Sequence, residues 1–343
     1  MFERVFKLSE HKTTVKTEVM AGITTFMTMA YILAVNPSVL GSTGMDTTAV
    51  LLATALASCL GTLCMAFMAN LPFALSAGMG LNAFMAYTVV AGYGYSWQVA
   101  LLAVFIEGLI FIVLSLTNIR EAIFNAIPLT LKKGVSVGIG LFIAFIGLQN
   151  SGLCVDSATL VGIISFPENF HTAGICALLT LIGLFFTAVF YTRKMKGAIL
   201  YGILLTWILG MLCQVTGLYV PTPDAGFYSL FPSWGMTDFS KLGLTFGQCF
   251  NVDFSAVGIV NFIVVIFSFL FVDIFDTLGT LIGVATKAKM LDKDGKLPGI
   301  KPALLADSIA TSAGAILGTS TTTTFVESAS GVAVGGRTGL TAL

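Results

Sequence analysis

Repeated runs of apolar residues constrain the fold of this chain more than any other feature of its sequence. The runs are ~17 to 25 residues long, which is the length of helix that crosses the hydrocarbon core of a bilayer. Charged residues make up only 10% of the 343 residues, whereas a soluble domain contains about 25%. The composition therefore predicts an all-α polytopic membrane protein in contact with the lipid bilayer. It excludes a soluble globular domain.

Ten apolar segments can be placed along the chain, and two of them are short. The predicted segments cover residues 19–40, 48–70, 81–92 (short), 98–117, 134–149, 173–192, 197–219, 256–286, 302–317 and a short one from 326. Residues 1–18 form a polar N-terminal segment that lacks the pattern of a cleavable signal. Residues 220–254 form a polar loop after the seventh segment.

The basic residues orient these segments, because cytoplasmic loops of membrane proteins collect Lys and Arg. Fifteen of the 17 basic residues lie in the N-terminal segment and in alternate loops, near residues 120, 194 and 290. This alternation is regular only if both short segments cross the membrane. It predicts a cytoplasmic N-terminus, an extracellular 220–254 loop, and location in the cell membrane.

Both short segments begin with a stretch that is unlikely to be helical. Residues 73–80 are rich in small residues, and residues 319–325 include four successive threonines, which favour a strand. Extended backbone inside a membrane must be shielded by protein, because lipid offers it no hydrogen-bond partners. We therefore expect two broken helices, a device by which transporters form a site near the bilayer midplane.

The spacing of the broken helices indicates an internal repeat. Leu81 and Val326 are 245 positions apart, and the first segments of the two halves begin about 240 apart. Seven segments in the first half place the second half in the opposite orientation, which predicts an inverted repeat. Residues 19–219 would form the first repeat and residues 255–343 the first three segments of the second. We therefore expect the complete protein to continue beyond Leu343, and this chain by itself not to transport.

Carboxyl groups within the apolar segments are the candidates for chemistry, because ionisable groups are costly in lipid and are commonly functional there. Asp273 and Asp276 are spaced i, i+3 and share a helix face. Two buried carboxylates cannot both ionise cheaply, so at least one should hold a proton near neutral pH. Glu327 follows the threonine run. The three predict a proton-coupled mechanism.

Other polar residues in the segments have competing interpretations. Asn82 either binds a ligand or caps its half-helix, since Asn is a favoured cap residue. Glu107 is at least as suited to a hydrogen bond between helices as to transport. Asp307, at the start of the predicted 302–317 segment, is more consistent with a helix-end charge or a support for the threonine run than with a transport role.

Four stretches of the sequence resemble the AzgA-like purine permeases of the nucleobase cation symporter-2 (nucleobase-ascorbate transporter) family. They are Ala21–Tyr31, Leu75–Asn82, Phe271–Gly279 and Gly318–Gly331. The resemblance implies a 7+7 inverted repeat, of which this chain contains about ten of fourteen segments. It implies a core domain of segments 1–4 and 8–10, and a gate domain of segments 5–7 together with the segments missing from this chain.

The family also implies proton-coupled uptake of hypoxanthine, guanine or adenine, with no cofactor besides the co-transported proton. Its substrate-binding residues correspond to Asn82, Asp273, Asp276, Thr324, Phe325, Glu327 and Ser328, and its proton-coupling residues to Asp273, Asp276 and Glu327. Phe325 would pack on the purine ring or belong to the core. The oligomeric state is left open between a monomer and a homodimer.

Competing functions lack their residues in this sequence. An anion transporter of related fold would need Arg or Lys at the depth of the half-helices, and a channel would need a continuous polar pore. An intramembrane enzyme would need a catalytic pair or a metal site, and the sequence contains no HExxH, GxSxG, P-loop or CxxC pattern. No catalytic, metal-binding or nucleic-acid-binding residues are therefore predicted. Uracil or xanthine remains the alternative substrate, and sodium the alternative coupling ion.

Overall fold

The computed structural model of the chain describes residues 2–117, 128–157, 160–193, 195, 198–222, 226–232, 235, 237–253, 257–292 and 297–343. The chain forms two compact units. The first comprises Met1–Ile139 with Thr237–Leu343, and the second comprises Gly140–Met236. Parts of the predicted 220–254 loop, and the basic residues Arg120, Lys194, Lys196, Lys293 and Lys296, lie outside the described residues.

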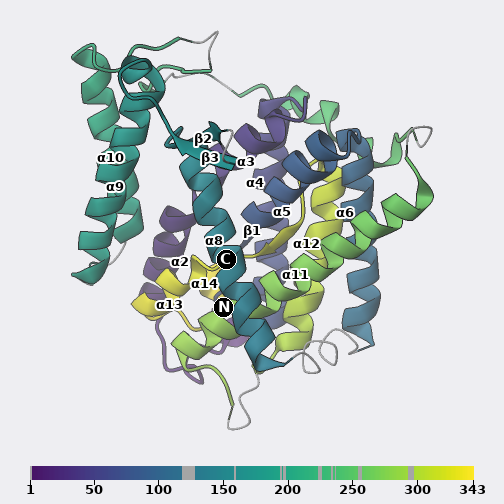
Figure 1. The fold of residues 1–343 in the computed structure, drawn as a ribbon. Coiled ribbons are helices and arrows are strands. Elements are labelled where there is room, and N and C mark those ends of the chain that lie inside the picture. The colour runs from purple at the N-terminus through teal and green to yellow at the C-terminus, as the bar shows by residue number, and fades with distance from the viewer. Residues whose placement is uncertain are drawn as a thin grey trace. The chain divides into compact units, whose positions relative to one another are not determined.

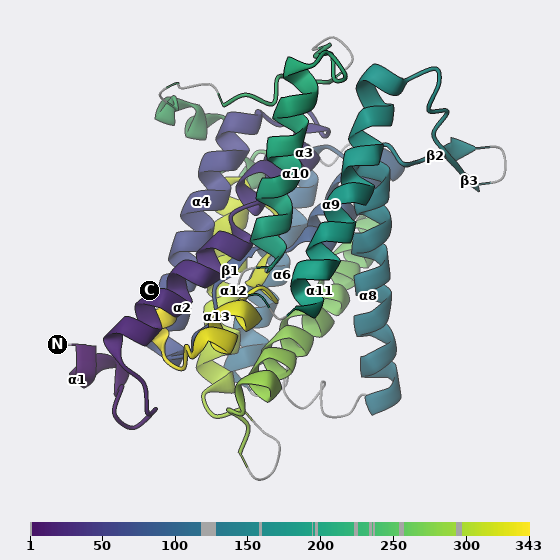
Figure 2. The same ribbon diagram turned by 90° about the vertical axis from the view of Figure 1, so that its left-hand side faces the viewer.

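The first unit is built from helices around one short strand pair (Figures 1 and 2). Its elements in chain order are α1 (Phe2–Phe6), α2 (Val15–Met29), α3 (Ile32–Gly41), α4 (Thr47–Cys64), η1 (Met65–Ala69), β1 (Leu75–Ala77), α5 (Met79–Ala83), η2 (Phe84–Gly92), α6 (Trp97–Leu116), the start of α8 (Leu129–Asn150), η5 (Phe239–Leu244), η6 (Gln248–Phe250), α11 (Ile259–Ala288), α12 (Ile300–Leu317), β4 (Thr322–Thr324), α13 (Ser328–Val334) and α14 (Gly339–Ala342). Helix α12 packs against both α4 and α6, and α11 packs against α6.

The second unit contains the remainder of α8, the hairpin of β2 (Cys154–Ser157) and β3 (Leu160–Ile163), and the helices η3 (Phe170–Gly174), α9 (Ile175–Thr192) and α10 (Ala198–Val215). Helices α9 and α10 approach closely through two glycines. A Cβ on Gly183 would lie 2.1 Å from the Thr206 hydroxyl, and one on Gly202 would lie 1.8 Å from the Thr187 hydroxyl. Small residues at such crossings allow membrane helices to pack backbone to backbone.

Helix is present in each of the ten ranges that the apolar runs predict. Among the described residues, six stretches are long and apolar enough to span a membrane: Val15–Gly41, Thr47–Ala69, Trp97–Leu116, Phe170–Thr192, Ile259–Thr286 and Ile300–Leu317. Met79–Gly92 and Tyr201–Val215 are shorter apolar helices. The chain is therefore a mostly helical, multi-span membrane protein, as its composition predicts. The predicted 19–40 segment falls within the span Val15–Gly41, which consists of two helices, because α2 ends at Met29 and α3 begins at Ile32.

Polar residues at the ends of the apolar helices satisfy backbone groups that the helices leave open. The Asp46 carboxylate accepts a hydrogen bond from the Ala49 amide at 2.9 Å and pairs with Lys241 at 3.1 Å. The Ala49 amide and Lys241 lower the pKa of Asp46 below its usual value. Gly318 takes φ 101° after α12, where the hydroxyl of Thr245, the residue directly after the helix η5 that contains Lys241, donates to the Leu317 carbonyl at 3.0 Å.

A buried carboxylate joins the start of α2 to the end of the chain. Glu18 is fully buried. It accepts hydrogen bonds from the amides of Arg337 and Thr338 at 2.9 and 3.1 Å, and from the hydroxyls of Thr338 and Thr341 at 2.7 Å each. Four donors replace the water that the carboxylate would lose on burial. Residues 337–341 are thereby held against α2.

We predict that Gly108→Ala destabilises the first unit by about 1–3 kcal/mol, which is the usual cost of overpacking a core. A Cβ on Gly108 would lie 2.3 Å from the hydroxyl and 2.8 Å from the amide nitrogen of Ser312, so α6 and α12 would have to separate. Thermal unfolding of the purified protein in detergent measures the effect. Gly283→Ala on α11 is the control, because nothing lies within 4 Å of its added Cβ. Equal melting temperatures for the two variants would contradict the prediction.

Candidate functional site

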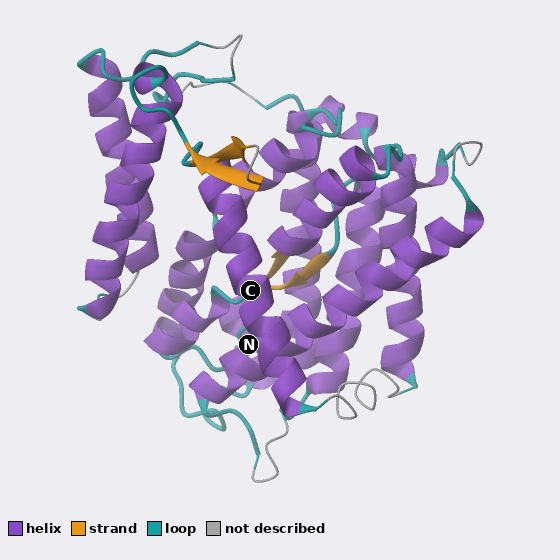
Figure 3. Cartoon of the chain, viewed as in Figure 1, coloured by secondary structure: helices purple, strands orange, loops and turns teal. Residues whose placement is uncertain are grey.

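Two broken segments meet in an antiparallel strand pair inside the first unit (Figure 3). Strand β1 pairs with β4 in the register Leu75–Thr324, Ser76–Thr323 and Ala77–Thr322. The pairing extends by one bond at each end, from the Gly78 amide to the Thr321 carbonyl and from the Phe325 amide to the Ala74 carbonyl, both at 2.9 Å. The predicted extended conformation of both stretches is confirmed. Their direct pairing was not predicted.

Side chains from neighbouring helices satisfy the outer edges of this strand pair. The Thr62 hydroxyl accepts from the Leu75 amide at 3.0 Å, and Ser328 Oγ accepts from the Ala74 amide at 3.0 Å. On the β4 side, Asp307 Oδ1 accepts from the Thr324 amide at 3.0 Å, and the Thr311 hydroxyl donates to the Thr322 carbonyl at 2.9 Å. Such partners are needed because unpaired backbone groups are costly away from water.

The two aspartates of α11 lie beside the strand pair. Asp273 is fully buried, and its Oδ1 is 2.9 Å from the Thr277 hydroxyl, which in turn contacts Thr323 of β4 at 2.7 Å. Asp276 is half-buried, and its Oδ2 lies 3.5 Å from the position that a Cβ on Gly78 would occupy. The structure thus brings both predicted aspartates to the point where the two broken segments cross.

Asn82 lies on α5, directly after the extended part of its segment. Its side chain is almost fully buried, and its Oδ1 accepts a hydrogen bond from the Ser320 hydroxyl. Its Nδ2, also buried, has no hydrogen-bond partner among the described residues. Buried donors are rarely left without an acceptor in native proteins. The amide of Asn82 can therefore donate to a bound molecule.

Glu327 precedes α13 and is bound by a tyrosine that the sequence analysis did not assign to the site. The Tyr31 hydroxyl donates to Glu327 Oε1 at 2.6 Å, a distance typical of a hydrogen bond to a carboxylate. Tyr31 lies in the junction between α2 and α3 and is also 3.3 Å from Met79 Sδ. Its position in the middle of an apolar segment was the signal available in the sequence. The carboxyl of Asp276 lies within electrostatic range of Glu327 and Asp307.

The remaining predicted site residues have structural contacts. The Thr324 amide donates a hydrogen bond to the Asp307 carboxyl, and the Ser328 hydroxyl accepts one from the Ala74 amide. Phe325 is only 5% exposed and packs with Met29, Ile32 and Ala74, which places it in the core in this conformation. The three residues therefore help to hold the crossing of the broken segments in place, Thr324 through its backbone, Ser328 through its hydroxyl and Phe325 through core packing.

Two carboxylates with open interpretations are resolved by their contacts. Asp307 supports the threonine run, but it is not a helix-end charge, because α12 begins at Ile300 and Asp307 lies two turns inside it. Glu107 of α6 accepts from the Thr321 hydroxyl at 2.9 Å, which is a bond between a helix and the broken segment. Sequence spacing could not show that both reach the same broken segment.

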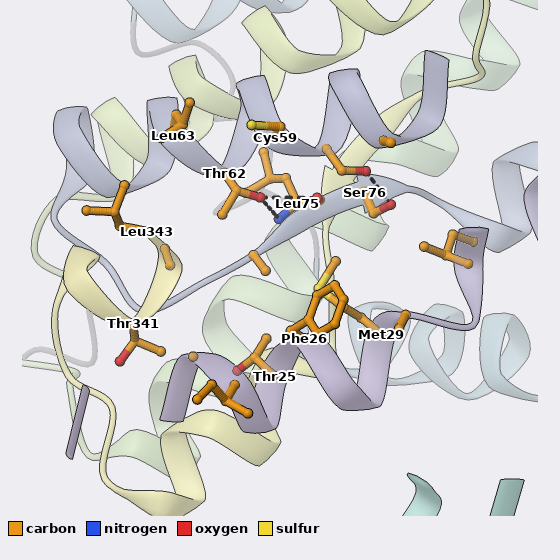
Figure 4. Close-up of a pocket in the computed structure, with 18 of the residues that line it drawn as sticks. Thr25, Phe26, Met29, Cys59, Thr62, Leu63, Leu75, Ser76, Thr341 and Leu343 are labelled. Atoms are coloured by element: carbon orange, nitrogen blue, oxygen red, sulfur yellow. Dashed lines mark hydrogen bonds between the residues drawn. The ribbon is translucent and has the colours of Figure 1, made fainter. Parts of the chain in front are cut away.

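A cavity of about 600 Å³ lies in the first unit between α2, α3, α4 and β1 (Figure 4). Apolar side chains from these elements form most of its wall, and Ser76 and Thr62 contribute its polar atoms beside β1. None of the carboxylates described above lines it. Ligand recognition usually needs a few convergent polar groups, so the crossing near Asp276 and Glu327 is the better candidate for the functional site.

Comparisons with known proteins agree with the resemblance drawn from the motifs. Residues 16–343 match the Permease family. The chain is 45% identical to the guanine/hypoxanthine permease PbuO of Bacillus subtilis, across 99% of this chain and 74% of PbuO. It is 42% identical to the adenine permease AdeP of Escherichia coli, across 100% of this chain and 72% of AdeP.

Two further comparisons concern a relative and the fold. The chain is 47% identical to the putative permease MJ0326 of Methanocaldococcus jannaschii, across 98% of this chain and 72% of the relative. Among solved structures, the transmembrane domain of the cyanobacterial bicarbonate transporter BicA has a similar fold. The TM-score is 0.62 at 16% identity, over 95% of this chain and 78% of that domain.

We predict that Tyr31 and Glu327 are energetically coupled by about 1.5–3 kcal/mol, the range for a hydrogen bond to a charged group. Thermal unfolding of Tyr31→Phe, Glu327→Gln and the double variant, combined in a double-mutant cycle, measures this coupling. The matched control pairs Glu327→Gln with Tyr95→Phe, which removes a tyrosine hydroxyl from the core and should be additive. Additive effects in the Tyr31 cycle would show that the 2.6 Å contact contributes no energy.

Proposed function

This chain belongs to the Permease family, and on that premise we propose that it is a secondary active transporter importing purine nucleobases across the cell membrane. The permeases for guanine, hypoxanthine and adenine that it resembles at 42–45% identity support hypoxanthine, guanine or adenine as the substrate. The observation that carries the proposal is the buried Asn82 Nδ2, a donor without a partner among the described residues, on the broken segment whose Gly78 approaches the Asp276 carboxyl. The activity is transport and not catalysis.

The polar groups of Asn82, Asp276 and Glu327 at the crossing complement a purine. A purine ring presents both acceptor nitrogens and N–H donors at its edge. Asn82 Nδ2 would donate to an acceptor, and the carboxylates of Asp276 and Glu327 would accept from ring N–H groups. A site of this kind rejects ligands that leave its buried polar groups unpaired. Ser328 would support the backbone behind the ligand. Thr324 would add a contact to the ligand, and Phe325 would pack on the purine ring.

We propose that the chain follows a 7+7 inverted repeat, in which residues 75–92 and 322–334 are the third and tenth segments. The paired strands of these segments and the likeness to the BicA transmembrane fold support this arrangement. The first unit would act as the core domain that holds the substrate, and the second would contribute to the gate. Alternating access would then come from movement of one against the other. The distribution of basic residues supports a cytoplasmic N-terminus.

We propose proton symport as the driving reaction. Asp273, Asp276 and Glu327 lie at or near the crossing, and carboxyl groups in a membrane interior can bind and release protons. One proton and one neutral purine would then move inward together. Sodium would not be required.

We predict that Glu327→Gln reduces uptake of radiolabelled hypoxanthine at least tenfold in cells that produce the full-length protein, because the loss of a charged hydrogen-bond partner costs about 1.5–3 kcal/mol. Competition with unlabelled guanine, adenine, xanthine and uracil would define the substrate. Glu168→Gln is the control, since Glu168 is exposed in the second unit. Absence of purine uptake by the native protein would refute the proposed function, and normal uptake by Glu327→Gln would refute the site.

We predict that uptake falls as the external pH rises, since a symported proton must bind from outside, and that a protonophore abolishes accumulation. Asp276→Asn should weaken this pH response, because an amide cannot bind the transported proton. Asp238→Asn, which changes an exposed loop carboxylate, should keep the native profile. Uptake is measured over a series of external pH values with sodium present or replaced. Strict sodium dependence with full accumulation in the protonophore would reject proton coupling.

A further inference from the structure

The hydroxyl of Thr277 lies at the centre of a buried group of oxygen atoms. Its Oγ1 is 2.9 Å from Asp273 Oδ1, 3.0 Å from Asp307 Oδ2 and 2.7 Å from the Thr323 hydroxyl. All four residues are at most 1% exposed. Thr277 therefore joins a carboxyl of α11, a carboxyl of α12 and strand β4 through one oxygen atom.

The number of hydrogens available in this group determines its charge. A threonine hydroxyl has one hydrogen to donate and two lone pairs to accept, whereas an ionised carboxylate can only accept. If Asp273 and Asp307 were both ionised, Thr277 would have to donate to both with a single hydrogen. All three contacts are satisfied when Thr277 donates to one carboxylate and accepts from Thr323 and from the second carboxyl group in its protonated form.

We propose that Asp273, Thr277 and Asp307 hold one proton between them, forming a proton-bearing site separate from the Asp276 and Glu327 carboxyls. The proton belongs to the pair of carboxyls and is not assigned to either one. With one shared proton, the two carboxyl groups carry a single negative charge. Burying one charge costs far less free energy than burying two. The amide of Thr324 also donates to Asp307 at 3.0 Å, so this shared charge helps to hold β4.

Among the residues that the structure describes, the charged groups named around this site are acidic. Asp276 lies on the same helix as Asp273, Glu327 follows β4, and Glu107 of α6 reaches the neighbouring Thr321. Helix α4, strand β1 and helices α5 and α13, which also pack nearby, contain no charged residue in their sequences. Neighbouring negative charges favour retention of the shared proton. Its role in coupling rests on the proposed transport function, and Thr277 would act there as a positioning residue.

Infrared difference spectra of the purified protein test the shared proton directly. A protonated carboxyl group absorbs apart from ionised carboxylates and shifts in D₂O. Subtraction of an Asp273→Asn or an Asp307→Asn spectrum from the native one should reveal this band at neutral pH. Each amide can donate in place of the proton, so the remaining carboxyl should ionise in either variant. Asp46→Asn, which removes a carboxylate paired with Lys241, should reveal only ionised carboxylate bands.

Two substitutions of Thr277 provide a second test if the aspartate variants do not fold. Thr277→Ser is the control that keeps the hydroxyl, and Thr277→Val removes it. Serine retains the hydroxyl, so the protonated-carboxyl band should stay at its native frequency, whereas valine should shift or abolish it. If the native protein takes up purine, Thr277→Val should also lower uptake several-fold and change its pH profile, and serine should restore both. A native spectrum with no band lost in either aspartate variant, or identical spectra for serine and valine, would overturn the inference. Absence of native uptake would refute the proposed function and leave the infrared result to decide the shared proton.

Discussion

Pairing of β1 with β4 is the interaction on which the first unit depends. Each broken segment leaves a stretch of backbone without helical hydrogen bonds, in a protein whose surroundings offer few other partners. The two stretches satisfy each other across the register from Leu75–Thr324 to Ala77–Thr322, and hydroxyl and carboxyl groups close the outer edges. Neither segment could be extended alone. The main role of the threonine run is therefore structural, because both its extended conformation and its hydroxyl groups stabilise the strand pair.

The same contacts tie the candidate site to the fold. Residues of the second broken segment reach Asn82 through Ser320 and Glu107 through Thr321. Thr323 contacts Thr277, which in turn contacts the two buried aspartates, Asp273 and Asp307. The hydroxyl groups of this segment are thus in contact with the side chains that we propose to bind the substrate or the proton. A displacement of the strands would change the partners of several carboxyls together. This is the kind of discrete rearrangement by which a packed protein couples two events.

Particular elements show where sequence reasoning succeeded and where it failed. Apolar length predicted the helices, and β-branched composition predicted the strand at Thr322–Thr324, because both signals are local. The division of the first apolar segment into α2 and α3 was not predicted, because an apolar run of sufficient length does not show where one helix ends and the next begins. Asp307 was placed at a helix start, but its helix begins at Ile300. The partners Tyr31 and Thr277 were not assigned, because their contacts join residues distant in the chain or on different helices.

The sequence by itself determined the membrane class, the helical segments, the two extended stretches and the residues able to carry chemistry, because hydrophobic length, strand preference and the cost of buried charge are properties of short stretches. Its motifs also identified the family. The tertiary structure alone decided which groups meet. It joined Tyr31 to Glu327, placed Thr277 between two carboxyls, and used Asp307 and Ser328 to satisfy the amides of Thr324 and Ala74. Contacts of this kind depend on how separate segments pack, and spacing along one segment cannot specify them.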